Sequence, residues 1–302
     1  MRISRHYIAL LASALIAANG ECQNPEIPGR DLLAFPVGLI AEAGALPNVF
    51  GGGFWNPAST RLPDGSRWRL SAAAISTPSD LSVNAHAGAV SGTWQGSTIT
   101  ASIVRASVPG LVRTESDPLT VSADLPYSTF VTSLGIARAY GSHLTWGVAG
   151  RVRTGQMELK KSAAVSVDAG FVADHLTRFD LRVGASTFLA SPWSRGSELA
   201  TYLAGADARL IQRDSVRSVR VGMSAASTQF GGSEQFAYLS ARYGAWEGRA
   251  GPARTTAHGS VNIRARMAVT IHYAGYAIGV AREGTPNGLA PSYQFALSSL
   301  LR

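Results

Sequence analysis

The side chains best suited to chemistry are arginines and aspartates that alternate with apolar residues. The set is Arg151, Arg153, Asp168, Asp180, Arg182, Arg220 and Arg242. Guanidinium groups bind carboxylates and other anions through paired hydrogen bonds. If these side chains face one interior, they either line a charged path, anchor another segment, or form ion pairs that fill the space. Ion pairs are the simplest interpretation.

The sequence contains none of the common catalytic signatures. We find no G-x-S-x-G, no H-E-x-x-H and no glycine loop that would hold a phosphate. The histidines beyond the N-terminal stretch are scattered over different predicted strands and turns: His86, His143, His175, His258 and His272. The sequence therefore predicts no enzyme, no cofactor and no metal site. A hydrolase built on a barrel wall is the alternative, and it needs a Ser or His cluster at one rim.

The elements that carry the charged side chains are predicted to be β-strands. In residues 143–153, 163–173 and 179–189, apolar residues alternate with polar or small ones. Side chains on a strand point to opposite faces with a period of two, so each run has one apolar face. Each run is also about ten residues long, the length with which a tilted strand crosses a bilayer.

Composition favours a membrane barrel. Hydrophobic residues make up 46% of the 302 positions and charged residues 15%, against about 25% charged in a typical soluble domain. The apolar stretch 32–46 is broken by Pro36, Gly38, Glu42 and Gly44, so it does not predict a membrane helix. These features predict an all-β, closed antiparallel transmembrane barrel in a bacterial outer membrane. A secreted soluble sandwich or barrel is the rival.

The first residues have the layout of a secretory signal peptide. Arg2 and Arg5 precede an apolar stretch, and small residues end at Gly20, so we expect residues 1–20 to be removed. Cys22 is the only cysteine and excludes an intramolecular disulfide. The formal charge of +8 comes from arginines spread singly along the chain, a pattern that does not predict a nucleic-acid partner.

Residues 21–66 do not alternate and are predicted to form a plug, or hatch, inside a barrel made by residues 67–302. Fourteen strands are predicted, with twelve as the alternative because Pro252 falls inside one of them. The ranges are 67–76, 81–94, 97–107, 128–140, 143–153, 162–173, 179–189, 198–209, 216–226, 234–246, 249–255, 257–264, 268–281 and 291–302. After the first hairpin, short turns and longer loops alternate, which is typical of an outer-membrane barrel that starts in the periplasm.

Two motifs resemble a known family. The segment Phe54-Trp55-Asn56-Pro57-Ala58 is similar to the N-terminal hatch of FadL-type outer-membrane proteins, and residues 166–171 are similar to a mid-barrel strand of that superfamily. The superfamily includes long-chain fatty-acid transporters and the PorV/PorQ-type proteins of the type IX secretion system. The resemblance implies a fourteen-stranded barrel with an internal hatch. It also implies that Phe54, Trp55, Asn56 and Pro57 contact a substrate or hold the hatch.

Two functions follow as hypotheses. The first is passive transport of hydrophobic small molecules, with an apolar pocket or wall opening beside Trp55 and Asn56. The second is a barrel that docks partner proteins through its outer loops, above all residues 109–127, without transporting small molecules. In either case we expect membrane lipid around Trp94 and Trp146, and recognition of the last strand, 291–302, by the barrel-assembly machinery.

Overall fold

The structure is a computed structural model that describes residues 27–34, 37–50, 53–63, 65–77, 82–111, 125–191, 200–214, 217–229, 232–257, 259–284 and 290–301. The predicted signal peptide, residues 1–20, lies outside these ranges.

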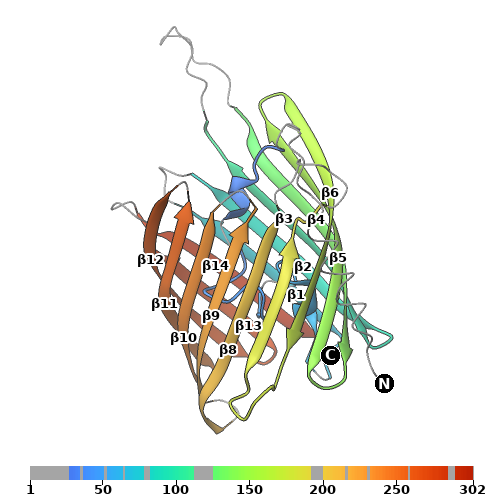
Figure 1. The fold of residues 1–302 in the computed structure, drawn as a ribbon, viewed down its shortest axis with the longest axis vertical. Coiled ribbons are helices and arrows are strands. Elements are labelled where there is room, and N and C mark those ends of the chain that lie inside the picture. Colours follow the sequence, from blue (N-terminus) through green and yellow to red (C-terminus); the bar gives the residue numbers. More distant parts are fainter. Residues whose placement is uncertain are drawn as a thin grey trace.

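The described chain forms one closed antiparallel barrel of fourteen strands (Figure 1). The strands are β1 (Trp68–Ser76), β2 (Asn84–Trp94), β3 (Ser97–Val108), β4 (Tyr127–Tyr140), β5 (Leu144–Met157), β6 (Lys160–Ala173), β7 (Arg182–Phe188), β8 (Thr201–Asp214), β9 (Arg217–Thr228), β10 (Ser233–Tyr243), β11 (Trp246–Ala257), β12 (Ser260–Tyr273), β13 (Tyr276–Glu283) and β14 (Ser292–Leu301).

The barrel closes between its first and last strands. β1 pairs with β14 from Trp68 opposite Leu301 to Ser76 opposite Tyr293. Every other strand pairs with its neighbours in sequence, so the sheet closes on itself, although β6 pairs with β7 only from Gly170 to Ala173. The predicted fourteen-stranded barrel is therefore confirmed, the twelve-stranded alternative is wrong, and the two-layer sandwich is excluded.

The outer face of the barrel is apolar. Large hydrophobic side chains on alternate strand positions are exposed there, including Leu134, Met223 and Ile263 at 63%, 65% and 71%. The alternation predicted for β5 is confirmed, because Leu144, Trp146, Val148 and Val152 are exposed while the residues between them are mostly buried. An exposed apolar band around a closed sheet is the surface that a bilayer covers.

The two ends of the barrel differ. Short connections follow β2, β4, β8, β10 and β12, and we call this the short-turn end; longer ones follow β1, β3, β7 and β13 at the long-loop end. Exposed aromatics gather at the short-turn end, where strands begin or finish: Trp68, Trp94, Tyr140, Trp146, Tyr243, Trp246, Tyr273 and Tyr276. Aromatic rings in such a band sit at the level of lipid headgroups.

The strand prediction is wrong in detail at two places. Residues 154–161 form a continuous hairpin around a tight turn at Glu158 and Leu159, not a long loop. The turns predicted at 247–248 and 265–267 lie inside β11 and β12, and the chain instead reverses at 244–245 and 274–275. The second error has a physical cause: Glu247 and Arg266 are charged strand residues that face the lumen, and their charge was interpreted as a turn signal.

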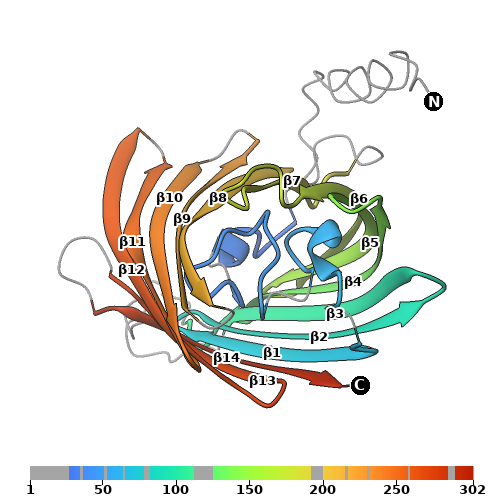
Figure 2. The same ribbon diagram turned by 90° about the horizontal axis from the view of Figure 1, so that it is seen from below.

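The lumen holds the N-terminal arm, which we define as the described part of residues 27–63. Figure 2, seen along the barrel, shows the arm enclosed by the ring of strands. The arm contains two short 3-10 helices, η1 (Asp31–Ala34) and η2 (Pro57–Thr60), and no helix of the described residues is long and apolar enough to cross a membrane. The main hydrophobic core lies between the arm and the inner wall.

Candidate functional site

Asn56 fixes the arm to the wall at the start of η2. Its side-chain amide donates to Ala45 O at 2.6 Å and to Phe171 O on β6 at 3.3 Å, and its Oδ1 accepts from the backbone N of Ala58. Asn56 is fully buried, and Pro57 follows at the first helical position, where no amide hydrogen is needed. The Asn-Pro-Ala motif thus joins two parts of the arm to a strand.

Glycines on three neighbouring strands give the arm room to approach the wall. Gly147 on β5, Gly170 on β6 and Gly184 on β7 face the lumen. A methyl group at these positions would overlap the Pro57 backbone, Asn56 Oδ1 and Ala45 O respectively. Gly147 and Gly170 are direct cross-strand partners. We call these three glycines the glycine seat. Only glycine allows a backbone to pass so close to another.

Three aromatic rings pack the arm onto β7. Phe54, Trp55 and Phe188 contact one another with ring centroids 4.7–5.2 Å apart, and all three are buried. Trp55 Nε1 also donates to Val37 O, and the carbonyl of Trp55 accepts from Ser186 Oγ. Phe54 and Trp55 therefore lie inside the barrel, in a packed cluster.

Arg151 and Asp168 form a fully buried ion pair beside the aromatic cluster. Arg151 Nε donates to Asp168 Oδ2, and the guanidinium carbon lies 5.0 Å from the Phe54 ring centroid and 4.8 Å from that of Phe188. Asp168 also accepts from the backbone N of Leu189 and Ala190. Because both charges are buried, separating them would leave an unpaired charge in the interior, so the pair holds β5 and β6 in a fixed arrangement.

Arg153, two residues further along β5, holds the beginning of the arm. Its guanidinium donates to Ile27 O, Pro28 O and Thr129 Oγ1. Both β5 arginines are thus inward-facing as predicted, and both bind partners within the protein.

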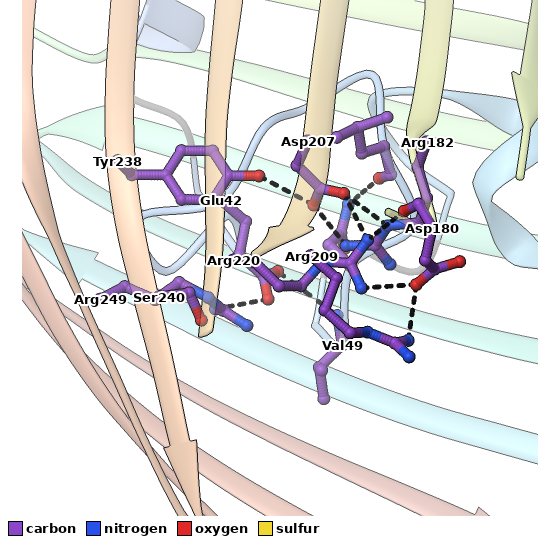
Figure 3. A network of polar contacts seen from close by, with 12 residues as sticks. Glu42, Val49, Asp180, Arg182, Asp207, Arg209, Arg220, Tyr238, Ser240 and Arg249 are labelled. Atoms are coloured by element: carbon purple, nitrogen blue, oxygen red, sulfur yellow. Dashed lines mark hydrogen bonds and ion pairs between the residues drawn. The ribbon is translucent and has the colours of Figure 1, made fainter. Parts of the chain in front are cut away.

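A second polar network lies at the short-turn end, on β7 to β10 (Figure 3). Asp207 accepts from Arg182, Arg220 and the hydroxyl of Tyr238. Asp180, in the β6–β7 connection, pairs with Arg220 and Arg209. Burial by itself would raise the pKa of Asp180, but the hydrogen bond and charge of Arg220 outweigh burial and hold the pKa below its ordinary value. The structure brings together the predicted Asp180, Arg182 and Arg220.

Sequence reasoning missed Asp207 and Tyr238, although both occupy inward strand positions. The alternation of β8 and β10 could have shown them. It also missed the long-loop-end cluster of Glu234, Arg264, Arg266 and Glu283, because 265–267 was predicted to be a turn. Arg242 faces the lumen as predicted and donates to Gly244 O at 3.4 Å.

Glu42 connects the arm to the opposite side of the wall. Arg249 on β11 lies 2.5 Å from Glu42 Oε1 and also pairs with Glu247, which in turn contacts His272. Burial raises the pKa of Glu42 to about 6, although Arg249 opposes the shift. The sequence offers one signal for this contact: Glu42 is an acidic residue inside the otherwise apolar stretch 32–46.

Cavities lie between the arm and the wall. The vestibule, about 490 Å³, is open at the short-turn end and is lined by the arm, β1, β10 and β12 to β14, with Arg61, Arg69 and Arg242 among its residues. A cavity of about 20 Å³ lies towards the long-loop end beside Leu39, Glu42 and Ile75, and one of about 10 Å³ lies beside Phe50 and Phe54. Neither Trp55 nor Asn56 lines any of these three cavities, because both side chains are packed against the wall.

No group of three or more His, Cys, Asp or Glu side chains in the described ranges is arranged to hold a metal ion. The charged side chains of the lumen instead pair with one another or with backbone atoms, so the geometry is that of a filled interior crossed by narrow cavities.

No protein-family model matches this chain, and no curated protein matches it. Solved structures do match. A TodX mutant described as a monoaromatic hydrocarbon channel is 10% identical, with 87% of this chain and 97% of that chain covered and a TM-score of 0.62. The chain has the fold of these channels. CymD, also described as a monoaromatic hydrocarbon channel, is 11% identical, with 88% and 98% covered and a TM-score of 0.59. The Pseudomonas putida toluene transporter TodX is 11% identical, with 86% and 95% covered and a TM-score of 0.58.

The predicted resemblance to FadL-type proteins is confirmed for the fold, a closed fourteen-stranded barrel. Identities of 10–11% show a shared fold and do not transfer a ligand.

Proposed function

We propose that this protein is a passive channel for small hydrophobic molecules in the bacterial outer membrane. The observation that carries the proposal is a closed barrel whose lumen is filled by a separate arm, with a cavity of about 490 Å³ left between arm and wall. The similar structures are named as channels for monoaromatic hydrocarbons. Diffusion past an internal arm needs no catalytic group and no cofactor.

In this proposal the arm is the hatch. The hatch is anchored to β5, β6 and β7 by Phe54, Trp55, Asn56 and Pro57. These side chains do not contact the substrate, because they are packed against the wall or hydrogen-bonded to it. The charged residues Arg151, Arg153, Asp168, Asp180, Arg182 and Arg220 line the lumen as structural pairs.

The surroundings follow from the same geometry. Membrane lipid covers the apolar outer face, and the short-turn end faces the periplasm, where barrel strands of this type begin and end. The assembly machinery recognises β14, whose Tyr293, Phe295 and Leu297 are exposed on the outer face. Partner docking of the PorV/PorQ kind is not part of the proposal, because residues 112–124 of its expected loop lie outside the described residues.

The test is uptake by liposomes that hold the purified protein. We expect labelled toluene and a labelled fatty acid to enter faster than into protein-free liposomes, and a charged sugar to be excluded. A variant without residues 21–58 should admit all three, because the lumen is then open. Uptake equal to that of protein-free liposomes, in both the full chain and the deletion variant, overturns the proposal.

A further inference from the structure

The vestibule and the smaller cavity beside Glu42 lie on the same side of the arm, one above the other. Both are lined by β12 to β14 and β1. On β13, Ala281 lines the upper cavity and Ala277 the vestibule. On β14, Gln294 lines the upper cavity and Ser298 the vestibule. The inward position between each pair is Gly279 on β13 and Ala296 on β14.

At that intermediate level the wall is built of its smallest side chains. Gly279 is the cross-strand partner of Ala296, Ala296 is the partner of Ala73, and Ala73 is the partner of Ala87. A run of glycine and alanine across β13, β14, β1 and β2 leaves the inner wall hollow at this height. Small side chains occupy little of the lumen, so the arm must fill it.

The arm fills it with two of its largest apolar side chains. A methyl group at Gly279 would lie 2.8 Å from the Phe50 ring and 3.3 Å from Ile40 Cγ2, so both side chains rest directly on the glycine. Phe50 is 3% exposed and Ile40 fully buried. Phe50 also borders the cavity of about 10 Å³ beside β2 and β3. The ring therefore has a small free space on the side that faces β2 and β3.

The contact is one that can open without breaking a hydrogen bond. Phe50 meets the wall through an apolar ring, whereas Asn56 meets it through hydrogen bonds. The ring lies at the level of Gly279 and Ala296, between the residues that line the vestibule and those that line the cavity beside Glu42.

We propose that Phe50, supported by Ile40, is the gate of the channel, and that molecules pass along the face formed by β13, β14 and β1. This inference rests on the proposed transport function. The gate selects by size and apolarity, because a passing molecule must take the place of the ring against glycine and alanine.

The experiment compares the wild type with four full-length variants in the liposome uptake assay with labelled toluene. Phe50→Ala removes the gate, Phe50→Ala with Ala296→Leu refills the space from the wall, and Ala296→Leu alone narrows the path. Phe236→Ala is the matched control, because it truncates an equally buried phenylalanine on β10 that lines none of the three cavities. Heat-modifiable migration in detergent gels verifies that each barrel is folded.

We expect a several-fold faster uptake with Phe50→Ala, a return to the wild-type rate or below in the double variant, slower uptake with Ala296→Leu, and no increase with Phe236→Ala. An unchanged rate with Phe50→Ala, while deletion of residues 21–58 accelerates uptake, overturns the gate and leaves the transport function standing. An equal rise with Phe236→Ala also overturns it. If Phe50→Ala does not fold, Ala296→Leu decides, since an unaltered rate there places the path elsewhere.

Discussion

The arm meets two halves of the barrel wall in different ways. Against β5, β6 and β7 it makes backbone-to-glycine contacts and the hydrogen bonds of Asn56, which require fixed positions. Against β13, β14 and β1 it makes mainly side-chain contacts between cavities, with Phe50 and Ile40 over Gly279, and one hydrogen bond from Gly38 N to Gln294 Oε1. The first half seats the arm, and the second, with fewer polar contacts, leaves it able to move locally. A hatch held more firmly on one side can admit a molecule without leaving the barrel.

The largest expected effect comes from the buried ion pair behind the seated half. Arg151→Met leaves the Asp168 carboxylate buried without its guanidinium, which costs about 3–5 kcal/mol of barrel stability. Urea unfolding in detergent micelles, followed by heat-modifiable migration, measures the loss. The control is Arg217→Met, since its pair with Asp214 is about half exposed and should be worth less than about 1 kcal/mol. Equal losses of stability in the two variants would show that the buried pair contributes no more to the barrel than the exposed pair does.

The second-largest loss of stability is expected at the glycine seat. Gly170→Ala places a methyl group on Asn56 Oδ1 and 2.9 Å from Ser186 Cβ, and overpacking of this kind costs about 1–3 kcal/mol. The arm should become sensitive to protease while the barrel stays intact. Gly150→Ala is the control, because nothing lies within 4 Å of its added carbon. If the arm stays protected from protease in Gly170→Ala, the close contact between Asn56 and Gly170 is not needed for docking.

The pH dependence of arm docking tests the contact between Glu42 and Arg249 on β11. Burial raises the pKa of Glu42 from 4.5 to about 6, so the docked arm binds a proton more tightly than a released arm. Docking is therefore strongest below pH 4.5, weakens as pH rises through about 6, and loses about 2 kcal/mol in total.

Protease protection of the arm across this range measures the effect, and Glu42→Gln should make the profile flat. Protection that increases with pH would mean that the ion pair with Arg249 outweighs the burial of Glu42.

The smallest effect is expected at the open vestibule. Arg242 contacts Gly244 O and no arm residue by a hydrogen bond, so Arg242→Ala should change docking by less than about 0.5 kcal/mol. It should, however, lower the preference for anions, because Arg61, Arg69 and Arg242 line the mouth together. Reversal potentials in a salt gradient measure this preference. Arg138→Ala, which removes an exposed arginine from the outer wall, should leave them unchanged.

Much of the architecture could be predicted from alternation alone. A period of two decides which face of a strand is apolar, and it correctly placed Trp146 outside and Arg151 inside. The same signal failed at Glu247 and Arg266, where inward charges resemble a turn when their partners are unknown. The non-alternating N-terminal stretch and its Asn-Pro-Ala motif were enough to indicate a segment inside the barrel.

The sequence by itself determined most strands and the face that each turns outward, because these depend on neighbours along the chain. Only the tertiary structure decided which lumenal groups meet: Glu42 with Arg249, Asp207 with Arg182, and Phe50 with Gly279. Alternation fixes the direction of a side chain but not its height in the lumen. That height is set by strand tilt and stagger when the barrel closes, and by the path of the arm within it.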